Sequence, residues 1–129
     1  MKLLAVWILL FFSLAFTSIK DKEENTRFIL IEAQCNPGFD ALPEFKEKVV
    51  LTKVFKREFE NAFEMVNAEP DLIVDFEVAL EKAYPNSRNQ VKDILVYMMN
   101  SEKEAKELYN RKLKQFKTLE TGVIDLKIK

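Results

Sequence analysis

The side chains that could perform chemistry in this chain of 129 residues are carboxylates, lysines and one thiol, because the chain contains no histidine. Histidine is the commonest general base and the commonest metal ligand in proteins. A serine or cysteine nucleophile would need Lys, Asp or Glu as its base, and Cys35 alone cannot assemble a zinc site. The inventory therefore predicts a protein that is not an enzyme and holds no metal ion.

Motifs that bind phosphate, calcium or nucleic acid are also missing from the sequence. Gly38 and Gly122 are its two glycines, so neither a Gly-rich phosphate loop nor a Gly-x-Ser-x-Gly elbow can be written. No D-x-D-x-D-G calcium loop occurs. The net charge of −1 gives no basic field for nucleic acid. We therefore expect no cofactor and no nucleic-acid partner.

Cys35 is the single cysteine and cannot form a disulfide within the chain. It precedes Asn36, Pro37 and Gly38, a turn signature that would make the thiol accessible. Two alternatives follow: a buried apolar side chain, which we favour, or an intermolecular disulfide. The protein is accordingly expected to be a monomer, or a dimer linked through Cys35.

The first eighteen residues have the pattern of an export signal. Lys2 supplies a positive start, residues 3–12 are an unbroken apolar run, and Ser13 and Ala15 are small residues suited to a signal peptidase. The run is shorter than the ~20 residues that span a bilayer, so no stable membrane span is expected after cleavage. We predict a signal peptide at 1–18, cleaved between 15 and 18, and one secreted, extracellular domain at 19–129.

Helical spacing dominates the segments that would position these side chains. Apolar residues recur at steps of three and four between 44 and 67 and predict the longest helix. A second helix is predicted at 70–84, between Pro70 and Pro85. Two patterns typical of helix starts follow: Ser87 with Gln90 before the apolar residues of 91–99, and Ser101 with Glu104 before a helix that ends ahead of Gly122.

Two segments also fit extended structure. In 27–35, Ile29 and Ile31 suit a strand, but a short apolar run cannot be settled by its period, and we favour a helix because the following segments look helical. Residues 124–129 alternate apolar and charged, which is a strand pattern, but a lone strand frays without a partner. The predicted fold is all-α: a single-domain bundle of four to five helices with a short C-terminal extended tail.

Aromatic and methionine side chains are the candidate binding residues. The plainer interpretation is that they form the core; the functional hypothesis is that they line a cavity for a small hydrophobic ligand. The six predicted ligand-binding residues are Phe55, Phe59, Phe63, Phe76, Met98 and Phe116.

The predicted function is that of a secreted, non-enzymatic helical binding protein that carries a small hydrophobic ligand in a Phe/Met-lined core. The alternative is a secreted protein-recognition factor, of the effector or signalling type, which binds an extracellular protein through a helix face or the C-terminal strand.

Overall fold

A curled five-stranded sheet lies between two long helices in the computed structural model, which describes residues 24–36, 38 and 41–129. The predicted signal peptide at 1–18 lies outside the described residues. The architecture is mixed α/β: the sheet is mixed and forms a half-barrel, and the described part of the chain contains three α-helices. None of these helices is long and apolar enough to cross a lipid bilayer.

The strand β1 (Thr26–Cys35) is the centre of the sheet. Along one of its sides runs β4 (Val91–Met99), antiparallel. Its other side is shared by β2 (Lys48–Thr52) and β3 (Phe55–Glu58), both antiparallel, and β5 (Gly122–Leu126) extends the sheet by parallel pairing with β2. Five strands from distant parts of the chain thus meet around one central strand.

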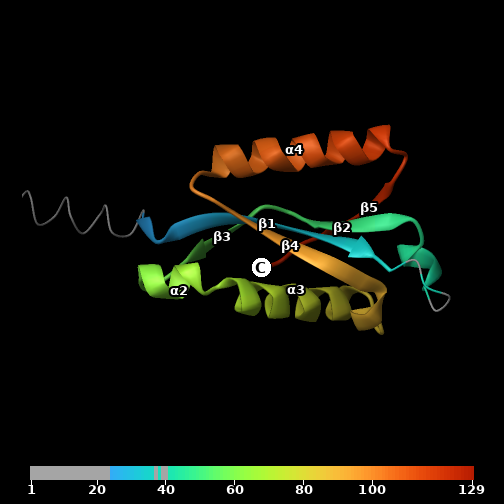
Figure 1. The fold of residues 1–129 in the computed structure, drawn as a ribbon, viewed down its shortest axis with the longest axis horizontal. Helices are drawn as coiled ribbons and strands as arrows, with labels where there is room; N and C mark the ends of the chain where they lie inside the picture. Colours follow the sequence, from blue (N-terminus) through green and yellow to red (C-terminus); the bar gives the residue numbers. More distant parts are fainter. Residues whose placement is uncertain (1–23, 37, 39–40) are drawn as a thin grey trace, which may run out of the picture.

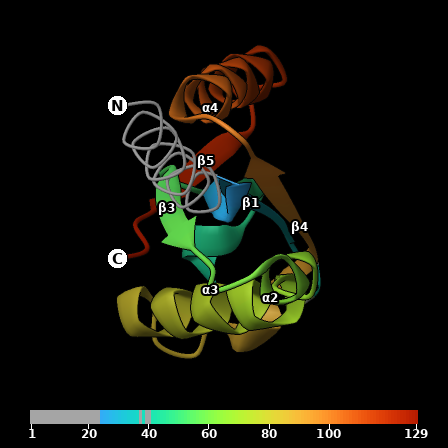
Figure 2. The ribbon, with the colours of Figure 1, turned by 90° about the vertical axis from the view of Figure 1, so that its left-hand side faces the viewer.

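The helices cover the two faces of this sheet. The short α2 (Ala62–Val66) leads into α3 (Glu69–Ala83) on one face, and α4 (Glu102–Thr118) lies on the opposite face (Figures 1 and 2). Two 3-10 turns, η1 (Pro43–Phe45) and η2 (Arg88–Gln90), precede β2 and β4. The main apolar cluster lies between α3 and the sheet and includes Ile29, Ile31, Phe45, Val50, Phe55, Leu72, Phe76, Leu80, Ile124 and Leu126.

The prediction of an all-α bundle of four to five helices is wrong, and the largest error falls on residues 44–67. They form η1, β2, β3 and α2 in place of one long helix. In β2 the side chains from Val49 to Thr52 are all buried, because helices cover both faces of the sheet there. A strand buried on both faces reads as a continuous apolar run and loses its period of two. The three-and-four spacing of the aromatic residues was therefore misleading.

The segments 27–35 and 91–99 are also strands and not helices. The β-branched Ile29 and Ile31, which suited a strand, lie in the middle of β1 and are fully buried. In β4, Ile94 packs against the cluster beneath α3, whereas Tyr97 lies on the α4 side, where it bonds to Glu32. Apolar side chains on both faces imitate a broad helical stripe.

Two of the predicted helices are confirmed, at 70–84 as α3 and after Ser101 as α4. The Ser101 hydroxyl accepts a hydrogen bond from the Glu104 N–H at 3.2 Å, as an N-cap does. The alternating C-terminal segment is extended, but it is not frayed: β5 pairs with β2, and Leu126 and Ile128 are buried. Gly122 does not cap α4 but begins β5.

Candidate binding groove

A groove of about 820 Å³ lies beside α3. One wall is the C-terminal half of α3, and the other is the end of β5 with the three residues after it. This volume is within the range of small-molecule sites in proteins. The residues that line it are Arg57, Asp75, Val78, Ala79, Lys82, Ala83, Tyr84, Asp125, Leu126, Lys127, Ile128 and Lys129.

The helical wall is fixed by the way α3 begins and ends. Pro70 lies in its first turn together with Glu69 and Asp71, whose negative charges complement the positive end of the helix dipole. The helix stops before Pro85, whose ring disfavours helical backbone in the residue ahead of it. Leu72, Phe76 and Leu80 anchor one side of α3 in the core, so the neighbouring side forms the groove wall.

The opposite wall follows from the alternation in the C-terminal segment. Leu126 and Ile128 turn toward the core and are almost fully buried. Lys127 and Lys129 are exposed between and after them. Together with Leu126 and Ile128, Lys127 and Lys129 belong to the groove lining, so the segment contributes both apolar and cationic residues to it.

Charge in the groove is predominantly positive. Arg57 of β3 donates to Asp75 of α3, with 3.0 Å between Nη2 and Oδ2, and this ion pair closes one side. Asp125, the other acid of the lining, is bonded to Lys53. Within the described ranges Lys82, Lys127 and Lys129 take part in no ion pair. These ammonium groups are therefore available to a negatively charged ligand.

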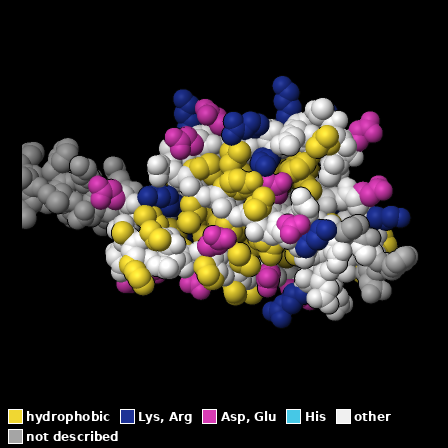
Figure 3. Space-filling model, in the orientation of Figure 1, with side chains coloured by type: hydrophobic (Ala, Val, Ile, Leu, Met, Phe, Trp, Pro, Cys, Tyr) yellow, Lys and Arg dark blue, Asp and Glu magenta, His cyan; other side chains and the backbone are white. Residues whose placement is uncertain are grey.

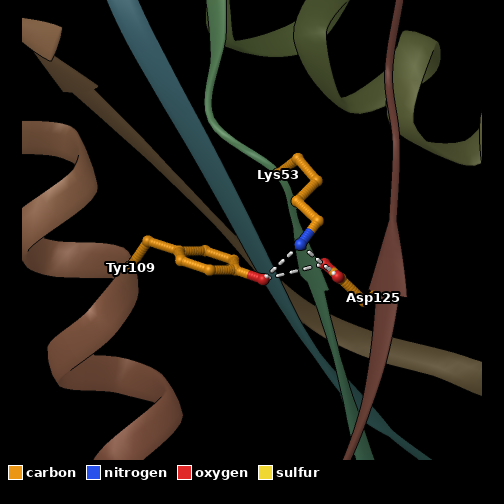
Figure 4. Close-up of polar contacts among 3 residues, drawn as sticks. All are labelled: Lys53, Tyr109 and Asp125. Carbon is orange, nitrogen blue, oxygen red and sulfur yellow. Dashed lines mark hydrogen bonds and ion pairs between the residues drawn. The ribbon is translucent and has the colours of Figure 1, made fainter.

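Asp125, which also lines the groove, meets two other polar groups, Lys53 and the α4 residue Tyr109 (Figure 4). Its Oδ2 is 2.6 Å from Lys53 Nζ, and the Tyr109 hydroxyl donates to its Oδ1 at 3.1 Å. Lys53 also donates to the Tyr109 oxygen at 3.1 Å. The hydrogen bonds to Asp125 and Tyr109 raise the pKa of Lys53 well above its usual range. This cluster links α4 to the sheet and pairs the negative charge of Asp125 with the ammonium group of Lys53.

The six residues predicted to bind a ligand are dispersed in the structure. Phe55 and Phe76 are buried in the cluster beneath α3, and Phe59 and Met98 pack at its margin. Phe63 lies on α2 and is 79% exposed. Phe116 is buried on the opposite face of the sheet, under α4. None of the six is part of the groove lining.

Cys35 lies in a second, smaller groove of about 460 Å³ at the other end of the sheet. The thiol is partly buried, and desolvation raises its pKa to about 11 although Lys48 opposes the shift. Glu32, Glu47 and Glu120 also line this groove. A Cys35-linked dimer stays a prediction.

No group of three or more acidic, cysteine or histidine side chains in the described ranges is arranged to hold a metal ion. Comparison of the chain with protein-family models, with curated proteins and with solved structures gives no match. The groove itself was missed from the sequence, although one signal for it was present: the alternation of Leu126, Lys127, Ile128 and Lys129. That pattern indicated an extended segment with buried apolar residues and exposed lysines.

Proposed function

We propose that the protein is a secreted, non-enzymatic binding protein, and that the groove beside α3 holds a small amphipathic ligand with a negatively charged head group. The observation that supports this is the combination of apolar walls and unpaired lysines in one hollow. Val78, Ala79 and Ala83 offer apolar surface, and Lys82 and Lys127 offer charge. Sites for small molecules commonly combine an apolar lining with a few polar groups that fix orientation.

The ligand location differs from the Phe/Met-lined core expected from the sequence. Phe76 is fully buried in the cluster beneath α3, and Phe55 is nearly so. A ligand between such rings would have to displace packed side chains, which costs free energy. The groove is open, so a ligand there displaces water only.

Isothermal titration with dodecanoate and with the uncharged dodecanol tests the proposal. We expect one dodecanoate per chain, bound more tightly than dodecanol. The double variant Lys82→Gln/Lys127→Gln should weaken dodecanoate binding about tenfold and leave dodecanol nearly unchanged, since charge-assisted contacts are lost. Lys103→Gln, on the exposed side of α4, is the control and should change neither. Absence of dodecanoate binding, or equal loss in the control, contradicts the proposal.

Secretion is part of the proposal and has its own test. The full chain, expressed in a eukaryotic cell, should appear in the medium with a new N-terminus created by cleavage between 15 and 18. Retention of the intact N-terminus in the membrane fraction would contradict it.

A second candidate function is recognition of an extracellular protein, and the exposed apolar side chains of α2 favour it. Phe63 and Val66 are 79% and 72% exposed, one turn apart on the same short helix. Exposed aromatic side chains are frequent anchors in protein interfaces. Native mass spectrometry of protein purified from its source separates the two candidates. A retained small molecule supports the groove. A partner protein that the wild type retains and the Phe63→Ser variant does not retain supports α2.

A further inference from the structure

The outer side of β4 is an open strand edge. Its inner side pairs with β1 along almost the whole strand, while no strand in the described part of the chain pairs with its outer side. Figure 2 shows β4 at the margin of the sheet, with α4 on one side and α3 on the other. An edge of this length presents unpaired N–H and C=O groups and is a template for pairing with another chain.

The pairing with β1 shows which β4 residues point their main-chain N–H and C=O groups outward, away from β1. The Ile31 N–H donates to Thr52 Oγ1 at 2.9 Å, on the β2 side of β1. Main-chain groups alternate along a strand, so those of Glu32 point to β4 and meet its partner Leu95. The next residue, Val96, therefore points its N–H and C=O outward. The residues with outward main-chain groups are Ile94, Val96 and Met98.

This edge is complementary to itself. When two β4 strands pair antiparallel about Val96, Val96 faces its own copy and Leu95 faces Tyr97. In the same register Ile94 lies opposite Met98, so every pair in the paired stretch is apolar or aromatic. No two like charges face each other in this stretch. Beyond Ile94 the strand bends, because Asp93 has a positive φ of 51° and the register with β1 shifts nearby.

Apolar side chains are exposed where such a pair would form. Leu95 is 49% exposed, and Val96, Met98 and Met99 are partly exposed. Figure 3 shows hydrophobic side chains gathered on this face, over the region of β4 between the two long helices. Pairing would bury them together with the strand edge.

Charges on α4 fit the same arrangement. Lys112 reaches Glu32 and the ring of Tyr97, so the flank of α4 that carries Lys112 faces β4. Glu104 and Arg111 lie on this flank, exposed and without an ion pair in the described part of the chain. Glu104 precedes Leu108 and Arg111 follows it, and the two are about two helical turns apart.

The helix α4 begins just after β4 ends and turns back over the sheet at an angle to the strand (Figure 1), so its first turns can be compared with the last residues of β4. Three residues of strand from Met99 back to Val96 cover about 10 Å, which equals about six or seven residues of helix from Glu102. We infer from these lengths that Leu108 is about as far from the connecting turn as Val96, near the axis of the pair. Across that axis Glu104 of each copy faces Arg111 of the other.

We propose that two copies of this chain associate through β4, paired antiparallel about Val96, with Glu104 and Arg111 forming two ion pairs between the α4 helices. The result is one continuous sheet through both copies. Cys35 is not required for this association.

Sedimentation of the reduced protein, with a charge-swap series, tests the proposal. We expect a concentration-dependent dimer in the micromolar range. Arg111→Glu replaces both ion pairs of the dimer with pairs of acids and should raise the dimer dissociation constant at least about tenfold. The double variant Glu104→Arg/Arg111→Glu restores opposite charges and should restore dimerisation.

The matched control is Lys114→Glu, which makes the same change of charge on the outer side of α4 and should leave the dimer intact. A second variant, Val96→Pro, removes one outward N–H and should give a folded monomer, since proline is tolerated at an outward-facing position of an edge strand. A protein that stays monomeric, or a dimer equally affected by Arg111→Glu and Lys114→Glu, overturns the proposal. Failure of the double variant Glu104→Arg/Arg111→Glu to regain dimerisation also overturns the proposal.

Discussion

The ammonium group of Lys112 on α4 lies 3.0 Å from the carboxylate of Glu32 on β1, and the pair is enclosed between helix and sheet. Their side chains are only 19% and 9% exposed. The Tyr97 hydroxyl donates to the same carboxylate oxygen at 3.2 Å. Burial alone lowers the pKa of Lys112, but the hydrogen bonds to Glu32 and Tyr97 outweigh it and the net shift is upward.

We predict that Lys112→Met lowers the free energy of unfolding by about 3 kcal/mol, because Glu32 is left charged and enclosed without its partner. Lys53→Met is the comparison, since its ion pair with Asp125 is exposed and should cost less than about 1 kcal/mol. Urea denaturation followed by circular dichroism measures both. Equal losses in the two variants would show that enclosure between α4 and the sheet has no energetic consequence.

A second prediction concerns the turn after α3. The Glu81 carboxylate accepts hydrogen bonds from the N–H groups of Asn86, Ser87 and Arg88, and the bond from Asn86 is the main cause of its lowered pKa. A lowered pKa in the folded state means that this stabilisation is complete above the ordinary pKa of about 4.3 and is lost as the pH falls through the folded value.

Glu81→Gln should therefore be less stable than the wild type at neutral pH, and the difference should shrink as the pH falls below about 4. Thermal unfolding over a series of pH values measures this. The control is Glu77→Gln on the same helix, because Glu77 accepts none of the hydrogen bonds from this turn and its loss should cost less stability at neutral pH. A difference for Glu81→Gln that stays constant with pH would contradict the assignment.

The end of α4 offers a stabilising substitution. Glu120 has a positive φ of 55°, and the Thr121 N–H bonds to the Phe116 carbonyl at 2.9 Å, the pattern of a Schellman motif. Glycine adopts this backbone without strain, so Glu120→Gly should raise the free energy of unfolding by about 1 kcal/mol. Glu107→Gly, inside the same helix, should lower it by about 1 kcal/mol. If Glu120→Gly lowers the free energy of unfolding as Glu107→Gly does, the backbone at Glu120 is not strained.

The reactivity of Cys35 is the fourth prediction. With its pKa raised to about 11 by burial, the thiol carries about a hundredfold less thiolate than an exposed cysteine at neutral pH. Alkylation by iodoacetamide should be slow in the folded protein and fast in urea. The folded rate should keep rising up to about pH 11. Rapid alkylation of the native protein would indicate an accessible thiol and favour a Cys35-linked dimer.

Sequence reasoning found the elements with one apolar side and one polar side. The helix α4 is the clearest case: Ala105, Leu108, Tyr109 and Phe116 face the sheet at steps of three and four, and polar or charged side chains occupy most of the remaining positions. The alternation after Gly122 was also correct as extended structure. Its partner, β2, could not be found because that pairing joins distant segments.

The four strands that were missed share a physical cause. Helices cover both faces of the sheet, so residues such as Val50 and Leu51 are buried on opposite sides and leave no polar position between them. Pairing between strands is decided by contacts far apart in sequence, which a local period does not contain. The candidate groove depends on the same long-range pairing, because β5 brings Lys127 beside α3 only when the sheet is complete.

The parallel pairing of β5 with β2 has a consequence for biosynthesis. A ribosome makes the chain from its amino end, so Val50 emerges long before Ile124, its partner in the sheet. Until then β2 has an open side, and the apolar cluster beneath α3 lacks Leu126 and Ile128. The sheet therefore cannot be completed until β5 has been synthesised, and until then its open side and apolar cluster are exposed to chaperones and to neighbouring chains.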